Sequence, residues 1–168
     1  SNRTTQEELL LLQELSTHPF VVAIGECGID RLKGADIKRQ TTLFEEHIIL
    51  SEKVRKPLII HAVKSSDIIL SLHRKYNPPQ TWIIHGYRGN ATTAQQYIRR
   101  GIELSYGEKF NPDAVATTPI DMLWIESDES CEDINNIYNN ISQAANIEPK
   151  ELKELIEKRA KRIFLGCD

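Results

Sequence analysis

Four ionisable side chains stand at or just after the ends of short apolar runs in the sequence. They are Glu26, His61, His85 and Asp128. Runs of this length that are rich in Val and Ile are typical of strands buried on both faces. In parallel α/β folds the carboxyl ends of the strands form the rim of the active site. Two imidazoles and two carboxylates that reach one rim are a set of metal ligands, so the pattern predicts a metal site.

The alternative for any one of these residues is an ordinary place at the edge of a sheet. A histidine at a strand end is more often hydrogen-bonded to its neighbours than bound to a metal. Four such residues, each in the same position relative to its strand, favour the metal site. The other histidines are expected to have surface or packing roles, because His18 falls in a loop and His47 and His73 fall within helical patterns.

Helical and strand patterns alternate along the chain. A long helix is expected over residues 37–55, because apolar side chains recur there at helical spacing. Other helices are expected before the first strand, after the second strand, after the third strand, where Asn90 is a good N-cap, and twice at the C-terminal end. Only a loop is expected between the last two strands. Five strands can be counted, and strands that alternate with helices predict right-handed βαβ units and a parallel sheet. With no internal repeat or linker, residues 1–168 are expected to form a single α/β domain.

Composition limits the classes of function. The net charge of −3 over 168 residues argues against a protein that coats duplex DNA through a broad basic face. The three cysteines have no CxxC spacing, so neither a disulfide framework nor a zinc knuckle is expected. The sequence contains no run of 18 apolar residues and no signal peptide, so no membrane partner is expected and the expected location is the cytoplasm.

Four motifs in a fixed order resemble the TatD family. They are residues 23–30 with Glu26, the strand that reaches His61, the segment 85–89 that follows the next strand, and residues 126–128. The resemblance runs from about residue 20 to Phe164. Members of this family are metal-dependent hydrolases of the amidohydrolase superfamily with a TIM (β/α)8 barrel, and several of them are DNases. The resemblance therefore implies a metal-dependent hydrolase of this fold.

The resemblance also implies a role for each matching residue. Glu26 would bridge two metal ions, and His61 and His85 would bind the second of them. Asp128 would bind the first ion and orient or deprotonate the attacking water. Glu126 matches an acid of the family two residues earlier and would face the substrate or support a ligand, so Asp128 and Glu126 are the expected catalytic residues.

The sequence departs from the family at three places. The family opens with a strand that carries His-x-His and supplies two ligands of the first metal, whereas this chain has no His-x-His. We therefore expect a barrel that lacks its first two or three strands. The explanation that we favour is that the missing residues are encoded upstream of Ser1, because the remaining ligand set looks intact. The alternative is a naturally truncated chain that completes itself by dimerising or is degenerate. Val63 stands where the family often has an arginine, and Arg159 stands where it has an asparagine.

Phosphodiester hydrolysis requires an activated water and neutralisation of the charge on the phosphoryl group. Two divalent ions roughly 3.5–4 Å apart achieve both. The imidazoles favour zinc, manganese or nickel, and the carboxylates also accept magnesium. Lys64, Arg88 and Lys109 follow their strands and are the expected substrate-binding cations. The alternative for each of these three is a solvated surface cation.

The expected function is that of a TatD-like deoxyribonuclease that hydrolyses phosphodiesters in the 3'-5' direction. Its expected substrates are the ends of single-stranded DNA or RNA. Two alternatives stay open. One is another reaction on the same barrel, as in an amidase, a lactonase or a phosphotriesterase, because a fold does not choose its reaction. The other is a catalytically inactive binding module, which the absent His-x-His suggests.

Overall fold

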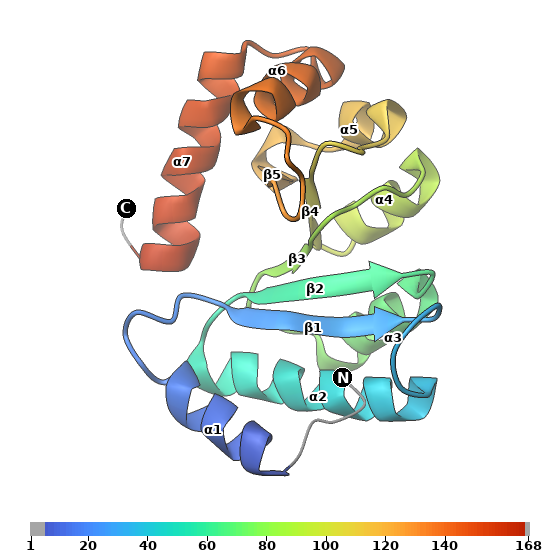
Figure 1. The fold of residues 1–168 in the computed structure, drawn as a ribbon, viewed down its shortest axis with the longest axis vertical. Helices are drawn as coiled ribbons and strands as arrows, with labels where there is room; N and C mark the ends of the chain where they lie inside the picture. Colours follow the sequence, from blue (N-terminus) through green and yellow to red (C-terminus); the bar gives the residue numbers. More distant parts are fainter. Residues whose placement is uncertain (1–5, 167–168) are drawn as a thin grey trace. The chain divides into compact units, whose positions relative to one another are not determined.

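Strands alternate with helices in the computed structural model of this chain, which describes residues 6–166 (Figure 1). The helices are α1 (Gln6–Ser16), α2 (Ile37–Val54), α3 (Ser66–Tyr76), α4 (Ala91–Ile98), α5 (Pro112–Thr117), α6 (Ile134–Ala145) and α7 (Pro149–Leu165). The strands are β1 (Ile24–Asp30), β2 (Leu58–Val63), β3 (Trp82–Ile84), β4 (Glu103–Tyr106) and β5 (Leu123–Ile125). A 3₁₀ turn, Ile120–Met122, precedes β5. None of the helices in the described part of the chain is long and apolar enough to cross a bilayer.

The chain divides into two compact units, Ser1–Trp82 and Ile83–Asp168. In the first unit β1 pairs with β2. In the second, β3 pairs with β4 and β4 pairs with β5. Every one of these pairings is parallel, as the alternation of helices and strands predicted.

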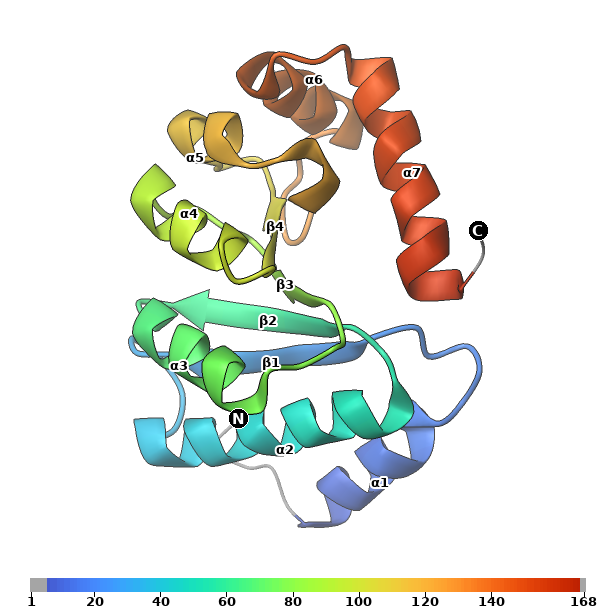
Figure 2. The ribbon, with the colours of Figure 1, turned by 180° about the vertical axis from the view of Figure 1, so that it is seen from behind.

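The first unit places its helices on one side of its strands. Both Figure 1 and Figure 2 show α1, α2 and α3 on the same side of the β1–β2 pair. The helix predicted over residues 37–55 is α2, which begins where the Asp36 side chain accepts a hydrogen bond from the Arg39 N–H at 3.1 Å. Its buried Phe44 packs against Trp82 with ring centroids 5.5 Å apart. Apolar burial between α2 and the strands is therefore what stabilises this unit.

Strand β1 differs from its prediction. The sequence predicted a strand that ends at Glu26, but β1 runs on to Asp30. The reason is that Cys27 and Ile29 continue the two-residue alternation and are buried beneath the strand. Glu26 therefore lies inside its strand rather than at the end. Strand β2 likewise continues two residues beyond His61, to Val63.

The second unit follows its predicted order with one addition. Its helices pack in succession, α4 on α5, α5 on α6 and α6 on α7. The predicted N-cap at Asn90 is confirmed, since its side-chain oxygen accepts the Thr93 N–H at 2.8 Å. The short helix α5 was not predicted. It forms because Asn111 caps it, accepting the Asp113 N–H at 3.0 Å, and because proline is favourable in the first turn of a helix.

Arg159 is buried at the amino ends of β4 and β5. Its guanidinium forms an ion pair with Glu103, lies 4.1 Å from the ring centroid of Trp124, and donates to the Leu123 carbonyl at 3.2 Å. The Trp124 indole N–H donates to the same Glu103 carboxylate at 2.6 Å. Only 6% of the Arg159 side chain and 13% of the Glu103 side chain are exposed. Arg159 therefore joins α7 to the strands.

Replacement of Glu103 by alanine should destabilise the protein strongly. The change leaves the Arg159 charge buried without its partner, which costs about 3–5 kcal/mol of unfolding free energy. Glu154→Ala is the matched control, because it removes a carboxylate from an exposed pair with Lys150 on α7 and should change stability little. Urea unfolding of both variants tests this, and equal losses of stability in the two would contradict it.

Candidate metal centre

Three potential metal ligands meet at the carboxyl ends of the strands in the second unit. His85 directly follows β3, and Glu126 directly follows β5. Together with Asp128 they offer ligand atoms that all lie within 4.8 Å of one another. The parallel pairing of β3, β4 and β5 places these strand ends at the same edge, which is why residues about forty apart in sequence lie together.

The Glu126 carboxylate is ionised and has a buried oxygen, which suits it to bind a cation. Its Oε1 atom is buried and has no hydrogen-bond partner among the described residues, and it lies 3.6 Å from Nδ1 of His85, beyond hydrogen-bonding distance. Burial raises the pKa of Glu126, but favourable interactions with His85 and Ser105 outweigh it and hold the pKa below its usual range. A buried, ionised oxygen without a hydrogen bond is stabilised when a cation faces it, so this donor set fits a divalent ion.

Two backbone features shape this cluster. Gly86 follows His85 with φ +57°, and a Cβ added there would lie 3.4 Å from Oε1 of Glu126. Asp128 adopts φ +46°, in a turn where the Ser130 N–H donates to the Ser127 carbonyl at 2.8 Å. The missing side chain at position 86 leaves room beside the Glu126 carboxylate, and the turn carries Asp128 back toward it.

A cavity of about 360 Å³ adjoins the cluster. Arg88 and Lys109 line it together with Glu126 and Asp128, and both cations are exposed. The loop that carries Arg88 is held from below by Tyr87, whose hydroxyl donates to the Asn90 carbonyl at 2.8 Å. Two of the three predicted substrate-binding cations therefore share a cavity with two of the predicted site residues.

Lys64, the third predicted cation, lies in the first unit. It follows β2 with an exposed side chain and φ +50°, and its carbonyl accepts a hydrogen bond from Arg31 at 2.8 Å.

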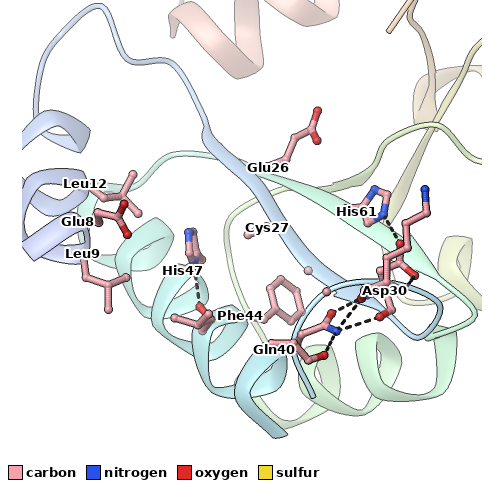
Figure 3. Close-up of a pocket in the computed structure, with 15 residues that line it drawn as sticks. Glu8, Leu9, Leu12, Glu26, Cys27, Asp30, Gln40, Phe44, His47 and His61 are labelled. Atoms are coloured by element: carbon pink, nitrogen blue, oxygen red, sulfur yellow. Dashed lines mark hydrogen bonds and ion pairs between the residues drawn. The ribbon is translucent and has the colours of Figure 1, made fainter. Parts of the chain in front are cut away.

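Glu26 and His61 lie together on neighbouring strands of the first unit. Gly28 on β1 is the partner of His61 in the strand register, so the His61 side chain falls between the positions of Glu26 and Asp30 on the same face. Figure 3 shows Glu26 and His61 on the side of β1 away from Phe44. Both residues line a cavity of about 720 Å³.

Asp30 is the residue of this face that sequence reasoning missed. Its Oδ1 accepts the N–H groups of Leu32 and Lys33 at 2.7 and 3.0 Å, and its Oδ2 lies 3.3 Å from Nε2 of His61. Burial raises the pKa of Asp30, but these hydrogen bonds outweigh it and lower the pKa from its usual value. The signal was present in the sequence, because Asp30 follows Glu26 by four residues and therefore faces the same side of a continuous strand.

Within each unit the structure brings predicted residues together. His85, Glu126 and Asp128 form the cluster of the second unit, with Arg88 and Lys109 beside it. Glu26 and His61 share a cavity of the first unit.

Parallel strands joined by helices, with imidazole and carboxylate groups at strand carboxyl ends, are typical of metal-dependent enzymes of the α/β barrel class. The model of the TatD-related DNase family matches residues 1–165. The chain therefore belongs to the TatD-related DNase family, a family of metal-dependent hydrolases.

Individual relatives agree with this assignment. The uncharacterized metal-dependent hydrolase YjjV of Escherichia coli is 28% identical over 82% of this chain and 58% of its own length. The uncharacterized metal-dependent hydrolase TatD of Mycobacterium tuberculosis is 34% identical over 70% of this chain and 49% of its own. The crystal structure of E. coli YjjV superposes with a TM-score of 0.86 at 22% identity, over 96% of this chain and 71% of the other. The fold is thus that of a partial TIM barrel, and the chain spans about half the length of the curated relatives it matches.

Replacement of Gly28 by alanine should disrupt the β1–β2 pair. A Cβ there would lie 2.1 Å from the His61 carbonyl oxygen, a backbone atom that cannot move aside while the strands stay paired. Gly101→Ala is the control, because Gly101 also has positive φ but faces open space, and should cost about 1–2 kcal/mol. Thermal unfolding should show a much larger loss for Gly28→Ala, and similar losses in both would refute the steric argument.

Proposed function

We propose that this chain is part of a metal-dependent nuclease that hydrolyses phosphodiesters at the ends of single-stranded DNA or RNA. The observation that carries the proposal is the cluster of the second unit. His85, Glu126 and Asp128 offer mutually close ligand atoms, and Arg88 and Lys109 line the same cavity. The carboxylates suit a metal ion, and the neighbouring Arg88 and Lys109 suit the phosphate of a substrate.

In the complete site, Glu26 would bridge two divalent ions, His61 and His85 would hold one of them, and Asp128 the other. The ions would supply an acidified water and neutralise charge on the phosphoryl oxygens. Zinc, manganese, nickel and magnesium all suit these ligands. Two further ligands of the ion that Asp128 binds would come from a His-x-His strand, which this sequence does not contain.

Side chains of the chain perform the remaining tasks. The Asp128 carboxylate would orient the attacking water and accept its proton. Glu126 would help to keep the site anionic where the cation binds. The Arg88 guanidinium would donate two hydrogen bonds to a pair of phosphate oxygens, and the Lys109 ammonium would attract a phosphate as a point charge. Lys64 would contact a further phosphate of the nucleic-acid substrate.

The names of two further relatives support a nuclease. One is deoxyribonuclease Tat-D of Schizosaccharomyces pombe, which is 27% identical over 64% of this chain. The other is the human 3'-5' RNA nuclease TATDN2, 30% identical over 60% of this chain. Because one is named for DNA and the other for RNA, the proposal covers the ends of both.

Replacement of Asp128 by asparagine in the complete gene product should lower kcat by about two to four orders of magnitude. The amide keeps the shape but cannot accept the proton, so KM should change little. Asp133→Asn is the control, because Asp133 caps α6 by accepting the Asn135 N–H and asparagine serves there equally well. Steady-state cleavage of a labelled single-stranded oligonucleotide measures both variants. An unchanged kcat in Asp128→Asn would show that Asp128 does not accept the proton of the attacking water.

Removal of divalent ions with a chelator should abolish cleavage by the complete gene product, and addition of Mn²⁺ or Zn²⁺ should restore it. The reason is that the reaction needs a positive charge at the site, and the buried Glu126 oxygen, which has no hydrogen bond among the described residues, favours a bound cation there. Cleavage at the full rate in saturating chelator would overturn the proposal. A product with no bound metal and no activity would support the inactive binding module instead.

Replacement of Arg88 or Lys109 by alanine should weaken the binding of negatively charged substrates but not of neutral ones. In Arg88→Ala and Lys109→Ala we expect KM for a phosphodiester to rise by about tenfold each, because one charge-assisted hydrogen bond is lost. Hydrolysis of neutral amides, lactones or phosphotriesters should not weaken with them. A substrate panel in which the neutral compounds are turned over and the diester is not would favour the alternative reactions of this barrel.

A further inference from the structure

We infer that Asp30 is a positioning residue for His61, which fixes the ring's tautomer so that Nδ1 is the metal-binding nitrogen. The inference rests on the proposed function for the presence of a metal, but not for the contact between the two side chains. Asp30 was not among the residues that the sequence pattern selected.

The contact lies across the β1–β2 pair. Oδ2 of Asp30 is 3.3 Å from Nε2 of His61, and 17% of the Asp30 side chain is exposed against 42% for His61. The more buried partner is therefore the carboxylate, which is held by its own strand. The ring reaches it because His61 is opposite Gly28, two residues before Asp30 on β1.

The chemistry of the pair determines the tautomer. An ionised carboxylate only accepts hydrogen bonds, so Nε2 must carry the proton that lies between the two side chains. A neutral imidazole has one proton, so the lone pair is then on Nδ1. Carboxylates that accept from the far nitrogen of a ligating histidine orient the ring and increase its basicity.

Asp30 itself is held from three directions. The amide of Gln40 accepts the Asp30 N–H at 2.8 Å and donates to the Asp30 carbonyl at 2.9 Å, so it replaces a neighbouring strand at this residue. The Leu32 and Lys33 N–H groups occupy Oδ1. Gln40 is buried, and its amide also donates to the Ala35 carbonyl at 2.7 Å. With Oδ1 and the backbone occupied, Oδ2 is the oxygen directed at the ring (Figure 3).

The decisive variant is Asp30→Asn. The side-chain oxygen must stay on the Leu32 and Lys33 N–H groups, because the reversed amide would set donors against donors. The amide nitrogen then faces Nε2 and donates to it, so the His61 proton must move to Nδ1. Asp36→Asn is the matched control, since it removes the same charge nearby while asparagine preserves the α2 cap.

The first measurement is the tautomer of His61 in the metal-free complete gene product. Two-bond ¹H–¹⁵N correlation at about pH 8, assigned with His61→Gln, should show the proton on Nε2 in the wild type and Asp36→Asn, and on Nδ1 in Asp30→Asn. A wild-type ring protonated at Nδ1 would overturn the inference. This test needs no metal and no activity, so it stands if the nuclease proposal fails.

The second measurement is the Zn²⁺ affinity, by competition with a fluorescent chelator. Asp30→Asn should bind about 10- to 100-fold more weakly than the wild type, and Asp36→Asn within about twofold. Equal affinity of Asp30→Asn and the wild type would overturn the inference while leaving the metal site in place. A wild type that binds no Zn²⁺, Mn²⁺ or Mg²⁺ would defeat the proposed function, and the tautomer would still decide the role of Asp30.

Discussion

The close approach of two backbones at Gly28 and His61 sets the register on which the first unit depends. A glycine at this position lets the β1 main chain lie directly against the His61 carbonyl. Because residues opposite each other in neighbouring strands project to the same face, this one contact places His61 between Glu26 and Asp30. A shift of one residue would turn the imidazole toward the helices and bury it beside Phe44. The functional face of this unit is therefore a consequence of a steric requirement in the backbone.

In the second unit, charged side chains rather than a close backbone contact distinguish the two ends of the strands. The strands of this unit have charged side chains near both of their ends. At the amino ends, Glu103 and Arg159 neutralise one another and Trp124 covers them. At the carboxyl ends, Glu126 keeps a buried oxygen with no hydrogen bond among the described residues. A buried ion pair joins elements of the fold, whereas a buried carboxylate oxygen without a hydrogen bond suits the binding of a cation. The contrast separates the structural end of these strands from the end that faces a ligand.

Much of this fold could be predicted from the sequence because apolar periodicity is strong in the helices. The limits of α2 and the cap at Asn90 were predicted within a residue. The end of β1 was not, because glycines at positions 25 and 28 look like loop residues while the buried Cys27 and Ile29 continue the strand. Gln40 shows a different limit. Its side chain, which comes from α2, makes the two hydrogen bonds to the Asp30 backbone that a neighbouring strand would otherwise make. This contact depends on the tertiary structure, and no local sequence pattern predicts it.

The two tryptophans of the chain are divided between its two units. Trp82 packs against Phe44 and the His73 ring in the first, and Trp124 packs against Arg159 and Phe164 in the second. Each indole is buried among contacts of its own unit. A chain in which either one is exchanged for phenylalanine would thus carry a single tryptophan, which can be excited selectively over the five tyrosines. The emission of such a pair of variants would reveal whether the barrel melts as one cooperative body or in two stages.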